Sequence, residues 1–115
     1  MADISLPPQR GCRKSFENSV RALIRTFRPK EIWIFGSCAR KGARWDSDVD
    51  MLVVKETHPS VPRPGHAARM IISRIKKELP VDLIVVSPEH WEKHKRNPQG
   101  VYIDVVENGI LVYAR

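Results

Sequence analysis

The sequence predicts a small α/β domain, in which a few strands alternate with helices. Four short runs rich in β-branched and aromatic residues have the composition of strands. The segments between them include two in which apolar residues recur every three or four positions, as on the buried face of an amphipathic helix. A chain of 115 residues is long enough for one domain with a modest core.

The first predicted helix spans residues 15–27. Its apolar residues form one helical stripe, Ser15 is the expected N-cap, and Pro29 follows the end. Residues 1–14 contain prolines and show no periodicity, so we expect a flexible leader there. The remaining residues, 15–115, are then a single domain.

Two strands follow this helix. Residues 31–35 (EIWIF) are short, apolar and bounded by Gly36, and residues 48–54 (DVDMLVV) begin with two acids and end in an apolar run. The segment 37–43 between them is long enough for a short helix.

The second half of the chain continues the alternation. A proline-rich loop precedes a helix, a third strand follows it, and the sequence Ser-Pro-Glu then has the form of a helix start. Residues 98–107 are compatible with either a helix or a strand. In chain order the predicted segments are the loop 55–64, the helix 65–79, the strand 81–87, the helix beginning at Pro88, the stop at Asn108-Gly109 and a closing strand, ILVY.

The charge balance favours an anionic partner, with 20 Lys and Arg against 13 Asp and Glu, but charge alone does not identify it. The basic residues of 69–77 lie on the outer face of a predicted helix, where we expect them to be solvated, so nucleic acid is not expected as the primary partner.

No apolar run approaches the roughly 20 residues that cross a bilayer, and no signal-peptide core follows the N-terminus. The expected location is the cytoplasm, where Cys12 and Cys38 would be reduced thiols.

Asp48 and Asp50 are the first candidates for chemistry. Two positions apart on a strand, their side chains point to the same face, where like charges repel. A cation between them would relieve that repulsion: either a basic side chain such as Arg40 or Arg44, or a divalent metal ion. Mg²⁺ prefers oxygen ligands, and Asp82 opens the next strand, from which it could reach the same ion and accept a proton from an attacking hydroxyl.

Gly36 and Ser37 are the second candidate pair. Glycine permits close backbone approach, and a following helix N-terminus offers free N–H groups, both of which suit a phosphate. Ser37 adds a hydroxyl, while Arg40, Lys41 and Arg44 add positive charge nearby.

Together these residues carry a resemblance to a known family. The stretch GSCARKGARWDSDVDMLVV is similar to the Gly-Ser and Asp-x-Asp signature of the DNA polymerase β-like nucleotidyltransferases, and in particular to the minimal nucleotidyltransferases. The resemblance extends from about residue 16 to residue 115 and includes the downstream strand Asp. It implies a small mixed sheet flanked by helices, similar to the polymerase β palm.

The resemblance also implies a reaction and a partner. Gly36 and Ser37 would hold the β- and γ-phosphates of a nucleoside triphosphate, with ATP the expected one. Asp48, Asp50 and Asp82 would bind two Mg²⁺ ions, and a hydroxyl would attack the α-phosphate and take up AMP. The implied acceptor is a tyrosine of a HEPN-type toxin encoded nearby. The protein would then be the antitoxin of that pair and would form a hetero-oligomer with the toxin.

Two alternatives to this function remain. Lys41 replaces the glycine that usually follows Gly-Ser-x-Ala-Arg, so the chain could instead neutralise its partner by binding, with weak catalysis. Transfer to a small molecule is the second alternative, although such members usually carry extra helical domains. His90 and His94 have a zinc-compatible spacing, but the residues between them are Trp-Glu-Lys and the H-E-x-x-H arrangement is absent, so surface histidines are expected. Of the tryptophans, Trp33 is expected in the core and Trp45 near the proposed site.

Overall fold

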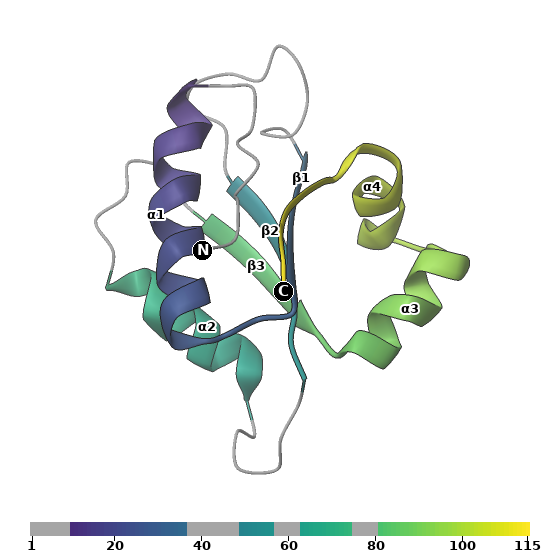
Figure 1. The fold of residues 1–115 in the computed structure, drawn as a ribbon. Helices are drawn as coiled ribbons and strands as arrows, with labels where there is room; N and C mark the ends of the chain where they lie inside the picture. Colours follow the sequence, from purple (N-terminus) through teal and green to yellow (C-terminus); the bar gives the residue numbers. More distant parts are fainter. Residues whose placement is uncertain (1–9, 37–48, 57–62, 75–80) are drawn as a thin grey trace.

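The computed structural model describes residues 10–36, 49–56, 63–74 and 81–115, with residues 10–16 and 49 described by their backbone alone. Helices and strands are interspersed along the chain, as the sequence predicts (Figure 1). In chain order the elements are α1 (Arg10–Thr26), β1 (Glu31–Phe35), β2 (Val49–Val54), α2 (Pro64–Ser73), β3 (Val81–Val86), α3 (Pro88–Arg96), α4 (Val101–Asn108) and β4 (Ile110–Ala114).

The strands form one mixed sheet in the order β3-β2-β1-β4. β1 is antiparallel to both β2 and β4, whereas β2 and β3 are parallel. The parallel pair requires a crossover connection, which contains α2. Helices α1 and α2 cover one face of the sheet, and α3 and α4 lie on the other (Figure 1). The mixed sheet flanked by helices is therefore confirmed.

A separate apolar cluster lies on each face of the sheet, because alternate residues of each strand point to opposite sides. On the α1/α2 face, the buried members are Val20, Leu23, Phe27, Ile32, Ile34, Met51, Val53, Ala68, Ile72, Leu83 and Val112. On the α3/α4 face, they are Phe35, Leu52, Val54, Val86, Trp91 and Val105. In β2, Met51 and Val53 thus face α1 and α2, and Leu52 and Val54 face α3 and α4.

The start of α1 differs from the sequence prediction. The helix begins at Arg10 rather than at Ser15, so residues 10–14 of the predicted leader are helical. These five residues include no proline, and the cost of one glycine, about 1 kcal/mol, does not prevent a helix from extending over them. The end of the helix agrees with the prediction, since α1 stops at Thr26, before Pro29.

The other boundaries follow the sequence more closely. α2 begins at Pro64 and extends to Ser73, while residues 75–80 lie outside the described part of the chain. The hydroxyl of Ser87 accepts a hydrogen bond from a backbone N–H in the first turn of α3, which confirms the predicted cap. The ambiguous segment 98–107 contains most of a helix, α4, and Gly109 follows its end. Within the described residues, no helix is long and apolar enough to cross a membrane.

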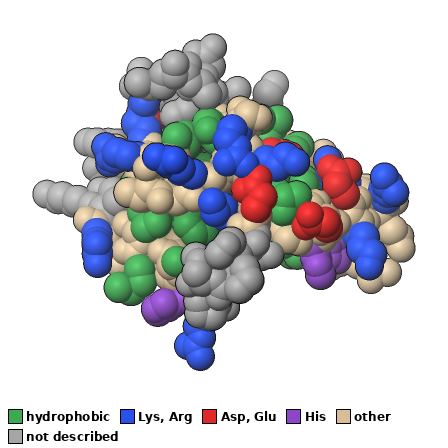
Figure 2. Space-filling view, turned by 60° about the horizontal axis from the view of Figure 1, so that its bottom comes forward, with side chains coloured by type: hydrophobic (Ala, Val, Ile, Leu, Met, Phe, Trp, Pro, Cys, Tyr) green, Lys and Arg blue, Asp and Glu red, His purple; other side chains and the backbone are tan. Residues whose placement is uncertain are grey.

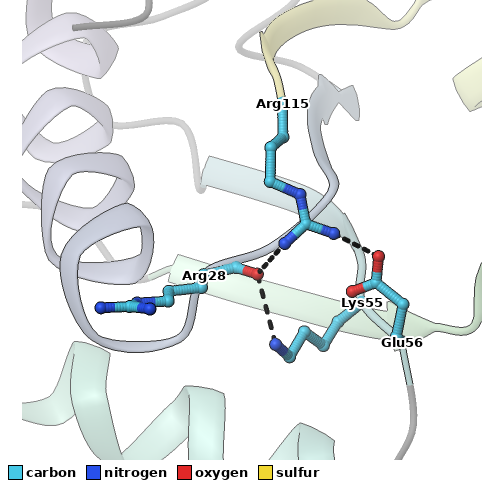
Figure 3. A network of polar contacts seen from close by, with 4 residues as sticks. All are labelled: Arg28, Lys55, Glu56 and Arg115. Atoms are coloured by element: carbon cyan, nitrogen blue, oxygen red, sulfur yellow. Dashed lines mark hydrogen bonds and ion pairs between the residues drawn. The ribbon is translucent and has the colours of Figure 1, made fainter.

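A polar network joins the chain segments at the end of the sheet where β1 begins (Figure 3). Arg28 has a left-handed backbone conformation, with φ of 52°, and its carbonyl oxygen accepts hydrogen bonds from Lys55 Nζ at 3.2 Å and Arg115 Nη1 at 3.5 Å. Arg115 also pairs with the carboxylate of Glu56. A hydrogen bond from the backbone N–H of Glu56, with smaller contributions from Arg115 and Lys55, lowers the pKa of Glu56 despite partial desolvation.

On the face that Figure 2 shows, Lys and Arg side chains are spread widely and acidic side chains lie among them.

Candidate functional site

The predicted site residues that the structure describes meet at one end of the sheet. β1 ends at this end, and the antiparallel β2 begins there, so Phe35 pairs with Asp50. β3 is parallel to β2 and also begins there, so Asp50 pairs with Asp82. Gly36 directly follows β1. Residues distant in the sequence therefore share one sheet end.

Asp50 and Asp82 also lie on the same face of the sheet. Leu52 and Val54 of β2 belong to the cluster on the α3/α4 face, and side chains on a strand alternate, so Asp50 faces that side as well. Asp82 is on the same side of β3 as Val86 by the same argument. Neighbouring strands lie about 4.8 Å apart, which brings the two carboxylates to one location. Asp50 is half-buried and Asp82 is exposed.

Gly36 is in a conformation that favours glycine. Its φ is +73°, in the left-handed region. A Cβ atom at this position would lie 3.1 Å from Cγ of Asp50 and closer still to its Oδ2. The missing side chain of Gly36 therefore leaves the space that the carboxylate of Asp50 occupies.

A fourth residue, Asp104 of α4, lies at the same place and was not predicted from the sequence. Its Oδ2 accepts a hydrogen bond from the backbone N–H of Gly36 at 2.9 Å. Its Oδ1 accepts one from Nδ2 of Asn108, also at 2.9 Å. No local pattern marks this residue, because its contact with Gly36 spans 68 positions of the chain. A prediction would therefore have required the tertiary structure.

The described carboxylates suit a hard divalent cation. Asp50 and Asp82 offer two oxygen-donor side chains at one location, and Mg²⁺ is usually held by one or two carboxylates together with substrate phosphates. Among the described residues there is no group of three His, Cys, Asp or Glu that could hold a metal ion. The predicted third ligand, Asp48, lies outside that part of the chain. So do the other predicted nucleotide-binding residues, Ser37, Arg40 and Lys41.

His90, His94 and the described tryptophans belong to an aromatic group between α3, α4 and the sheet. The ring of His94 stacks on Tyr102 with 3.8 Å between centroids, and the ring of His90 lies 5.0 Å from that of His94. Trp91 is almost fully buried and contacts Trp33 edge to face, with 5.6 Å between centroids. These residues pack the α3/α4 side. Trp45 lies outside the described residues.

Comparison with known proteins gives a family match and a structure with a similar fold. The chain matches the family described as "Nucleotidyltransferase domain" over residues 14–112. A proposed nucleotidyltransferase from Sulfolobus solfataricus, known from its crystal structure, is 22% identical in sequence. The comparison covers 96% of this chain and 94% of that one, with a TM-score of 0.55, and so shows a similar fold.

No curated protein is similar enough in sequence to count as a match. The family match extends over most of the chain and includes every described strand except the last two residues of β4. The chain therefore belongs to the family of nucleotidyltransferase domains, of the DNA polymerase β-like type.

Proposed function

We propose that this nucleotidyltransferase domain transfers AMP from ATP to a hydroxyl group of a partner protein, with Mg²⁺ as cofactor. The main observation that supports this proposal is that Asp50 and Asp82 are paired in register on parallel strands, with Gly36 next to Asp50. This places two carboxylates next to a turn that belongs to the Gly-Ser motif. The family match supports nucleotidyl transfer, and the choice of ATP and of a protein acceptor is the proposal.

In this proposal the carboxylates of Asp50 and Asp82, with Asp48, hold the metal. Bound Mg²⁺ would supply electrostatic stabilisation of the charge on the phosphate oxygens. The oxygen of the acceptor hydroxyl forms a bond to the α-phosphorus, and the bond from that phosphorus to the bridging oxygen of pyrophosphate breaks. Asp82 is exposed and is the proposed acceptor for the hydroxyl proton.

The position of Asp82 supports an acceptor from another molecule. β3 is an edge strand of the sheet, and Asp82 is near its beginning. A large group can approach an exposed side chain at such an edge without displacing a neighbouring strand. We propose a tyrosine of a HEPN-type toxin as the acceptor, which would make this protein an antitoxin.

A transfer assay tests the proposal. The protein is incubated with Mg²⁺, ATP labelled at the α-phosphate and the product of the neighbouring gene, beside an Asp50→Ala/Asp82→Ala variant. A Glu107→Ala variant, which changes an exposed acid of α4, is the matched control. We expect the parent and the Glu107→Ala variant to label the partner, and the double variant to label it at least about 100-fold more slowly, as expected when charge stabilisation worth a few kcal/mol is lost.

Two outcomes would contradict the proposal. If the double variant labels the partner as fast as the parent, the two carboxylates are not the catalytic pair. If both proteins neutralise a toxic partner and no label moves, the chain acts by binding alone. Replacing ATP by the other three nucleoside triphosphates tests the choice of AMP separately.

A further inference from the structure

We propose that Asp104 is a positioning residue of the nucleotide site, which acts by fixing the peptide group of Gly36. This inference rests on the proposed function. The carboxylate of Asp104 accepts the Gly36 N–H at 2.9 Å and thereby links α4 to the turn that follows β1. The link joins two parts of the chain 68 positions apart, so it exists only when α4 is packed on the sheet.

The carboxylate of Asp104 is held on both of its oxygens. Oδ2 accepts from Gly36, and Oδ1 accepts from Asn108, one helical turn further along α4. The helix itself is anchored, because Val105 is fully buried in the cluster on the α3/α4 face. At its end, Gly109 donates its N–H to the carbonyl oxygen of Val105 at 2.9 Å. A group fixed in this way can impose one orientation on the peptide that it binds.

The orientation of this peptide determines where Asp50 can be. Gly36 combines a left-handed φ with an approach to the Asp50 carboxylate that a side chain would block. If the N–H of Gly36 turned away from Asp104, the chain leaving β1 would also turn relative to Asp50. Asp104 thus acts on the carboxylate pair through Gly36.

The contact also assigns a role to the N–H of Gly36. An amide has one hydrogen to donate, and here it is directed at Asp104. The contribution of Gly36 is therefore its backbone conformation and small size.

Three variants separate positioning from the other roles that a carboxylate could have. Asp104→Ala removes the acceptor. Asp104→Asn keeps an acceptor oxygen for Gly36, and Asn108 can turn its amide so that its own oxygen faces the new NH₂ group. Glu107→Ala removes an exposed acid from the same helix. A role as metal ligand or as local negative charge would make Asp104→Asn resemble Asp104→Ala, whereas positioning predicts rescue by Asn.

The experiment measures binding of Mg²⁺ with α,β-methylene-ATP to each full-length variant by calorimetry. We expect Asp104→Ala to raise Kd about tenfold, because the peptide of Gly36 would have to be ordered when the nucleotide binds. Asp104→Asn should remain within about threefold of the parent, and Glu107→Ala should be unchanged. Circular dichroism checks that each variant is folded.

Each other result overturns the inference. Equal Kd values for Asp104→Ala and Glu107→Ala would show that the contact has no effect on the site, while the proposed function would stand. Tighter binding by Asp104→Ala would mean that Asp104 competes with the nucleotide. If Asp104→Asn binds the analogue as weakly as Asp104→Ala does, the effect comes from the charge of Asp104 or from metal ligation by its carboxylate. A folded parent that does not bind the analogue would refute the proposed function as well.

Discussion

Replacing Gly36 by alanine should destabilise the protein in two separable ways. A left-handed backbone costs an alanine about 1–2 kcal/mol. In addition, the new methyl group would lie 3.1 Å from Cγ of Asp50 and closer to Oδ2, where ordinary contacts begin at 3.4 Å. The carboxylate would have to rotate away, and overpacking of this kind typically costs about 1–3 kcal/mol. We therefore expect Gly36→Ala to lower the free energy of unfolding by roughly 2–5 kcal/mol.

A double-mutant cycle isolates the second contribution. The free energy of unfolding is measured by urea denaturation for the parent, Gly36→Ala, Asp50→Ala and the double variant. Without the Asp50 carboxylate the methyl group has space, so Gly36→Ala should cost about 1–3 kcal/mol less in the Asp50→Ala background. This difference is the coupling energy between the two positions.

Gly100 provides a matched control for the backbone contribution. It also has a positive φ, +60°, but a Cβ atom there would meet nothing within 4 Å. Gly100→Ala should therefore be destabilising by itself and additive with Asp50→Ala to within about 0.5 kcal/mol. If the changes in unfolding free energy for Gly36→Ala and Asp50→Ala are equally additive, the two residues do not approach each other as closely as the structure shows.

Three further substitutions test other parts of the structure. Ser87→Ala removes the hydroxyl that caps α3 and should cost about 1 kcal/mol in urea denaturation, whereas an unchanged midpoint would show that the cap is not formed in solution. Val105→Ala removes two methyl groups from a fully buried side chain and should lower the free energy of unfolding by about 1–3 kcal/mol; a loss below about 0.5 kcal/mol would mean that α4 is not packed on the sheet. The lowered pKa of Glu56 means that its ionised form stabilises the fold above its usual pKa of 4.5, and that this stabilisation is lost as the pH falls through the lowered value. Because Glu56 is exposed, Glu56→Gln should cost less than about 1 kcal/mol at pH 7, and the cost should disappear in acid; a cost that grows toward low pH would contradict this sign.

The strands were predictable because their signal is local. The segments EIWIF, VDMLVV and VDLIVV are rich in β-branched and apolar residues over five or six positions, and each forms a strand. The cap of α3 at Ser87 was equally predictable, since Ser-Pro-Glu provides an N-cap, a proline at the first helical position and an acid in the first turn.

α4 was ambiguous for a physical reason. Its sequence, VYIDVVEN, is rich in β-branched residues, which favour strands, yet it is helical in the structure. The burial of Val105 against the sheet stabilises the helix, and Gly109 allows the sharp turn into β4 that a side chain would block. Tertiary packing outweighs the local preference here, and Asp104 could not be placed before α4 was.

The sequence by itself determined the types of most elements, the chemical groups and the family resemblance, because these depend on neighbouring residues and on a short motif. Only the tertiary structure decided that Asp50 lies in register with Asp82 and that Asp104 binds the N–H of Gly36. Strand register and helix placement depend on contacts between residues far apart in the chain. Their free energies come from the packing of the whole domain, which no short stretch of sequence contains.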